Sequence, residues 1–241
     1  MSEYEIFPNA PVEEAIITIG VSPIGELNEG VERLANAFAT LYPVVETLET
    51  TGPAGEAEPG GPIRPGETTY RFLSADRQQA VQVTSTTFSF HRLRPYTHWQ
   101  RFSADARIAW QIFVPTFQPK SIKVLRLRYL NSLSRSADER WTEYLTMHPS
   151  IPDPLTPTLV SSLVSLSFAD GSVPAIARVN QTSEAMPDGE PRLVYDIDTQ
   201  SFHKNLDVEG DRLWLTLDKL CEFKDRLFSA GLTERAKELF R

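Results

Sequence analysis

The same succession of elements is predicted twice along this chain. A strand, a helix, several strands and another helix are expected over residues 15–116, and again over 121–228. This expectation rests on hydrophobic period, because apolar residues alternate in half-buried strands and recur every three or four residues in amphipathic helices. Such a repeat favours one large sheet built from two similar halves.

In the first half, short β-prone runs are separated by turn-like residues. The predicted strands span 15–21, 44–49, 68–74, 79–85 and 87–93. Between the first two, apolar residues at spacings of four and three predict a helix over 26–42 that ends at Pro43. A second helix is predicted to be capped by Thr97, with Gln100 in a capping box, and to reach Phe117.

The second half follows the same plan. Its predicted strands span 121–133, 159–168, 173–181 and 192–198, and a short helix is predicted at 137–147. A closing helix over 211–228 has an apolar stripe of leucines that continues through Lys224 to Phe228. Thr233 is predicted to cap a last helical turn.

These elements predict an α+β protein with one extended, mostly antiparallel sheet and helices packed on one of its faces. We expect a first half at 1–118 and a second half at 119–241, joined in one continuous globular unit. The segment 50–66, rich in glycine and proline, is expected to be a flexible loop.

Charge is unevenly distributed, although the net charge is −8. Residues 71–143 hold 12 basic and 5 acidic side chains, whereas residues 1–70 hold 2 and 12. Two explanations stay open: the basic strands pair with acidic neighbours in one sheet, or they form a surface for anions or nucleic acid.

Composition excludes several classes. No apolar run is long enough to span a membrane, and Glu3 and Glu5 stand where a signal peptide has basic residues. The single cysteine, Cys221, excludes a disulfide framework. A cytoplasmic protein is therefore expected.

Several short stretches carry a family resemblance. They include Asn-Ala-Pro-x-x-Glu-Ala at 9–15, Tyr-Arg-Phe at 70–72, residues 88–99, Arg-Tyr-x-Asn at 128–131, residues 196–198, Lys224 with Phe228, and Leu-Thr-Glu at 232–234. Together they resemble a sporadically distributed prokaryotic family of uncharacterised proteins of about this length. The resemblance implies a cytoplasmic protein, supplies no catalytic residues, and its patchy distribution suggests mobile or defence-linked genes.

Arginines and acids on predicted strands suggest a polar seam across the sheet, or an anion site. The residues in this set are Glu14, Arg92, Arg126, Arg128, Asn131, Asp196 and Asp198. A partly buried guanidinium needs a carboxylate to offset its desolvation, so ion pairing is the preferred reading. The alternative is a divalent cation held between Asp196 and Asp198 with oxygens from elsewhere.

A second candidate is an aromatic and basic surface that could stack bases of a single-stranded nucleic acid. Its residues are His91, Arg94, Tyr96, His98 and Trp99. The competing reading is a strand with core-facing phenylalanines followed by a helix anchor.

No catalytic signature occurs in the sequence, and the four histidines follow no metal-ligand spacing, so neither catalytic residues nor a cofactor or metal are expected. We expect a non-catalytic protein-interaction or regulatory subunit whose partner is another protein or a second copy of the chain. The alternatives are a nucleic-acid or anion binder that uses the basic middle third, and an enzyme of another class.

Overall fold

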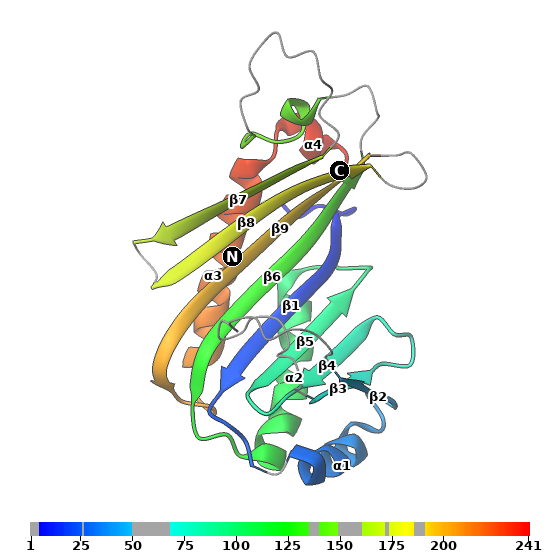
Figure 1. Ribbon diagram of the computed structural model, residues 1–241, viewed down its shortest axis with the longest axis vertical. Coiled ribbons are helices and arrows are strands. Elements are labelled where there is room, and N and C mark those ends of the chain that lie inside the picture. The colour runs from blue at the N-terminus through cyan, green and yellow to red at the C-terminus, as the bar shows by residue number, and fades with distance from the viewer. Residues whose placement is uncertain are drawn as a thin grey trace.

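Nine antiparallel strands among the described residues form one sheet, with four helices beside it (Figure 1). The computed structural model describes residues 5–25, 27–49, 68–134, 140–148, 161–171, 174–185 and 191–241. The elements are β1 (Val12–Val21), α1 (Leu27–Phe38), β2 (Val44–Glu49), β3 (Thr68–Leu73), β4 (Gln79–Val83), β5 (Thr87–Leu93), α2 (Trp99–Phe117), β6 (Ile122–Ser134), the 3-10 turn η1 (Trp141–Glu143), β7 (Ser162–Asp170), β8 (Ala175–Ala185), β9 (Pro191–Leu206), α3 (Arg212–Gly231) and α4 (Glu234–Glu238).

The strand order in the sheet is β2-β3-β4-β5-β1-β6-β9-β8-β7. The first strand of each predicted half therefore lies at the centre, where β1 pairs with β6. The predicted class, α+β with one large antiparallel sheet, is confirmed. The likeness of the two halves to one another stays a prediction.

Strand alternation gives the sheet one apolar face, which the helices cover. On β1, Ala15, Ile17 and Ile19 are fully buried in the main core. Phe88 of β5 packs against the rings of Trp110 and Phe113 in α2. Figure 1 shows α2 behind β1 and β5, and α3 behind β6 and β9.

A second, smaller core lies towards the end of α3. It joins Tyr195 and Ile197 of β9 to Leu232, Ala236 and Phe240 near the C-terminal end. The backbone N–H of Asn9 donates to the carbonyl of Phe240 at 3.0 Å, so the segment before β1 is fastened beside this core. In the described part of the chain, no helix has the length and apolar character needed to cross a membrane.

Several predicted boundaries differ from the structure. His98, not Thr97, caps α2, because its ring nitrogen accepts the backbone N–H of Arg101. The helix predicted at 137–147 is only the short turn η1 where the chain is described, and Leu145 instead forms a β-bridge with Leu232. The predicted flexible loop at 50–66 lies outside the described residues.

Candidate functional site

The face of the sheet opposite the core carries mainly polar side chains, and none of the described helices lies on it (Figure 1). We call this the open face. On β6, Leu125, Leu127 and Tyr129 belong to the helix-covered core. Arg126 and Arg128 alternate with them and therefore lie on the open face.

Two paired arginines form the centre of the open face. The guanidinium of Arg126 donates to both carboxylate oxygens of Asp198, at 2.7 and 2.6 Å. Arg128 contacts Asp196 in the same way, with both distances at 2.9 Å. Both aspartates are buried, so the bidentate geometry compensates their desolvation.

Hydrogen bonds extend this polar row towards the β7 edge. The side-chain amide of Asn180 donates to Asp196 at 3.3 Å, and the hydroxyl of Ser165 donates to the oxygen of that amide at 2.8 Å. Polar contacts thus continue from β6 through β9 and β8 to β7.

On the other side of Arg128, Glu14 of β1 lies 2.8 Å from Nδ1 of His91 in β5. Burial by itself raises the pKa of Glu14, but the hydrogen bond with His91 and the charges of His91, Arg71 and Arg128 outweigh it, and the pKa is lowered. Glu14 is therefore ionised at neutral pH. The polar row, from His91 through Glu14, Arg128 and Asp196 to Ser165, crosses six neighbouring strands.

Two members of the predicted seam lie on the opposite face. Arg92 follows His91 on β5, and its Nε donates to the carbonyl of Pro95. Asn131 is buried on the helix-covered side, where its amide donates to the backbone carbonyl of Tyr195 at 2.8 Å. The structure thus brings together Glu14, Arg126, Arg128, Asp196 and Asp198, and places Arg92 and Asn131 elsewhere.

The aromatic and basic residues of the second candidate are also divided. His91 lies on the open face, and Arg94 pairs with Glu13 at 3.1 Å. Tyr96, His98 and Trp99 lie on the helix-covered side, where all three line a cavity. They do not form one stacking surface with His91.

This cavity has a volume of about 110 Å³ and lies between the segment before β1, the start of α2 and the second half of α3. Several of the short sequence stretches noted in the sequence analysis meet there, although they are far apart in sequence. They supply Ala10, Pro11, Tyr96, Thr97, His98, Trp99, Tyr129, Asn131, Lys224 and Phe228.

The reactive groups of the cavity are held protonated or paired. Burial raises the pKa of the Cys221 thiol to about 12, so it is not a thiolate at neutral pH. The hydroxyls of Tyr96 and Tyr129 are bonded to each other at 2.8 Å, and burial raises the pKa of both. These groups are suited to binding by hydrogen bonds rather than to nucleophilic attack.

The sequence analysis did not single out this cavity. One signal was present: Lys224 interrupts the apolar stripe of the closing helix, and in the structure it is buried, with an ion pair to Asp225. The approach of Phe7 and Tyr96 to the same helix has no sequence signal, because it depends on how separate segments pack.

Within the described ranges, no three His, Cys, Asp or Glu side chains come together in a way that could hold a metal ion. Asp196 and Asp198 each contact an arginine instead. Comparison with known proteins finds no family model and no curated protein that matches this chain.

Proposed function

We propose that the protein is a non-catalytic subunit that binds another protein through the open face of its sheet. The observation that carries this proposal is the pairing of charges on that face. Arg126 and Arg128 each meet a buried carboxylate in bidentate geometry, so the face offers a broad polar surface with little unpaired charge. A protein partner can cover such a surface with polar contacts and water.

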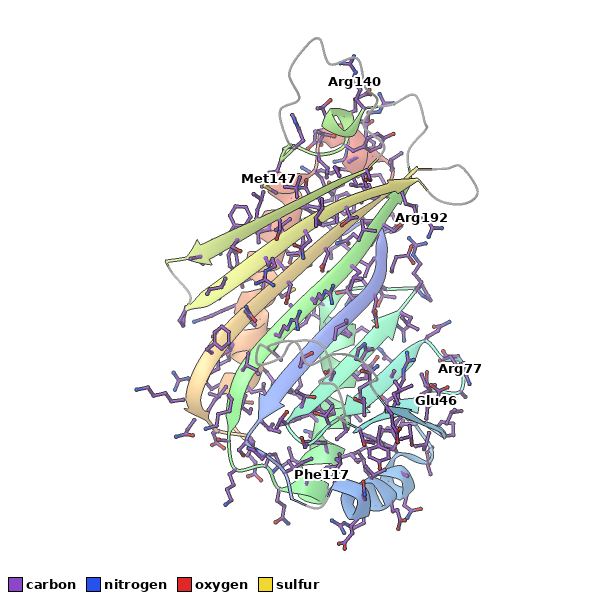
Figure 2. All side chains as sticks on the ribbon, in the orientation of Figure 1. Glu46, Arg77, Phe117, Arg140, Met147 and Arg192 are labelled. Carbon is purple, nitrogen blue, oxygen red and sulfur yellow. The ribbon has the colours of Figure 1, made fainter. Side chains whose placement is uncertain are left out.

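The same pairing disfavours nucleic acid as the partner. Affinity for nucleic acid comes mainly from cations that neutralise phosphates. Other arginines of the basic middle third are also paired: Arg77 lies 3.4 Å and Arg71 lies 4.0 Å from Glu46, and Arg101 lies 3.2 Å from Asp105. Figure 2 shows Arg77 beside Glu46 at the β2 end of the sheet.

Exposed apolar side chains on the open face indicate where a partner gains affinity. Phe202 of β9 follows Asp198 at a spacing of four, so it lies on the same face, and it is 50% exposed. Ile176 of β8 is the register partner of Gln200 in β9, which is two residues from Phe202, and its side chain is 44% exposed. Aromatic residues surrounded by polar ones are typical centres of protein interfaces.

The test is co-purification of the tagged chain from its native host, with mass spectrometry and measurement of stoichiometry. Phe202→Asp is compared with Leu215→Asp, which changes a side chain of similar exposure, 59%, on α3 on the other side of the sheet. We expect a stoichiometric protein that is lost with Phe202→Asp and retained with Leu215→Asp. The loss is expected to be about tenfold or more in affinity.

The proposal would be contradicted if both variants retained the partner protein equally. It would also be contradicted if the chain instead co-purified with a nucleic acid whose binding weakens as salt rises. Self-association through the same face is tested by sedimentation of the purified chain with and without Phe202→Asp. We place this subunit in a regulatory role in the cytoplasm, with its gene at a mobile or defence-linked locus.

A further inference from the structure

The cavity on the helix-covered side has several aromatic side chains in its walls. Five aromatic side chains of the described residues line it: Phe7, Tyr96, Trp99, Tyr129 and Phe228. They come from the segment before β1, the segment that leads into α2 and its first residue, the centre of β6, and the second half of α3. Aromatic walls of this kind favour a planar or cationic group.

The position for a cation is already filled by Lys224. Its Nζ lies 4.2 Å from the centroid of the Tyr129 ring, and the residue is only 9% exposed. The ammonium group also pairs with Asp225. An amine ligand would share this small space with the like charge of Lys224, which already occupies the face of the Tyr129 ring.

Two carboxylates of the described residues line the cavity, and both are engaged: Arg241 donates to both oxygens of Glu5, and Lys224 pairs with Asp225. Donors remain on the lysine and on the tyrosine pair. An ammonium group has three N–H donors, and among the described residues Asp225 is the acceptor that Lys224 contacts. Tyr96 and Tyr129 have two O–H groups but share one hydrogen bond, which leaves one O–H to donate elsewhere. Asp225 is engaged by Lys224 and by the Cys221 thiol.

We propose that this cavity binds a small aromatic carboxylate, with its ring between the aromatic walls and its oxygens accepting from Lys224 and the tyrosine pair. The volume of about 110 Å³ limits the ligand to at most one ring, since a larger cavity of about 150 Å³ in another protein holds one benzene molecule. Drug-sized ligands need about 300 Å³ or more. Occupancy of this cavity does not require the protein partner proposed above.

The experiment titrates the full chain with benzoate, benzylamine and benzyl alcohol, and follows binding by ligand-observed NMR and calorimetry. We expect saturable binding of benzoate, at least about tenfold tighter than benzyl alcohol, because a charge-assisted hydrogen bond is lost with the alcohol. Lys224→Met should lower the affinity for benzoate by about tenfold or more. Lys219→Met, at an exposed position of the same helix, should leave it unchanged.

Two further variants separate loss of binding from loss of the fold and test the tyrosine hydroxyl. Lys224→Met leaves Asp225 without its partner, so Lys224→Met with Asp225→Asn is measured beside it, and circular dichroism checks the fold. Tyr96→Phe keeps the ring and removes one hydroxyl. It should lower the affinity for benzoate by a smaller factor than Lys224→Met does. Tighter binding of benzylamine, benzoate affinity unchanged in the lysine and tyrosine variants, or no saturation with any probe would each overturn the proposal.

Discussion

At the residue scale, the buried polar groups of this protein differ in whether a hydrogen-bond or ion-pair partner compensates their burial. Asp196 and Asp198 are buried, and a guanidinium group contacts both carboxylate oxygens of each. His203 of β9 is the opposite case, because its Nε2 is buried and has no hydrogen-bond partner among the described residues. Burial lowers the pKa of His203 below its ordinary 6.5, and the charge of Arg212 lowers it further.

This shift predicts a pH dependence of stability. The unfolded chain takes up a proton on His203 near pH 6.5, whereas the folded protein does so only at lower pH. The free energy of unfolding should therefore fall as the pH drops from 6.5 towards the lowered folded pKa, by less than about 1.4 kcal/mol per pH unit for one group. Urea unfolding between pH 7 and pH 5 measures it.

His203→Asn should flatten this dependence, and Arg212→Gln should reduce it in part, because only one of the two causes is removed. Identical slopes for the wild type and His203→Asn would show that His203 does not cause the pH dependence.

At the element scale, helix packing depends on close approach as well as on apolar period. Gly30 of α1 is buried against Phe117 at the end of α2, and a Cβ at this position would lie 2.1 Å from Cε1 of the Phe117 ring. Phe117 lies at the end of the molecule where α1 crosses α2 (Figures 1 and 2). The glycine therefore sets the separation of these two helices.

Gly30→Ala is expected to destabilise the protein by about 1–3 kcal/mol, because the added methyl group displaces a packed ring. In an exposed helix the same change would stabilise by about 1 kcal/mol. Asn36→Ala, at an exposed position of α1, is the control and should stabilise slightly. Denaturant unfolding compares the three proteins, and a Gly30→Ala variant more stable than the wild type would exclude the close contact.

At the scale of the whole molecule, acids from outside the basic middle third pair with several of its arginines. Asp196 and Asp198 of β9 pair with β6, while Glu13 and Glu46 lie in the acidic first third. Among the described residues, folding therefore places acids from the other two thirds beside Arg71, Arg77, Arg94, Arg126 and Arg128. This compensation makes the open face a polar surface rather than a cationic one.

Asp196→Asn with Asp198→Asn should create anion binding that the wild type lacks, because Arg126 and Arg128 lose these carboxylates. Binding of single-stranded DNA, measured by fluorescence anisotropy, should appear and weaken with salt, with a slope of roughly −1.4 for two phosphate contacts. The matched control, Asp207→Asn with Asp211→Asn, changes the net charge equally at exposed positions and should not bind. Equal DNA affinity of wild type and variant would contradict the compensation.

The sequence by itself determined the fold class and the faces of the central strands. Alternation placed Leu127 and Arg128 on opposite sides of β6, and spacings of three and four located α1, α2 and α3, because both signals are local. It did not determine the cap of α2, which is His98 and not the predicted Thr97.

Only the tertiary structure decided which groups meet. Arg126 and Asp198 are 72 residues apart, and their contact depends on the register between β6 and β9, as well as on the alternation within each strand. The cavity likewise needs Phe7, Tyr129 and Lys224 to converge from three separate segments. Such contacts are fixed by burial of the whole core, which no local pattern contains.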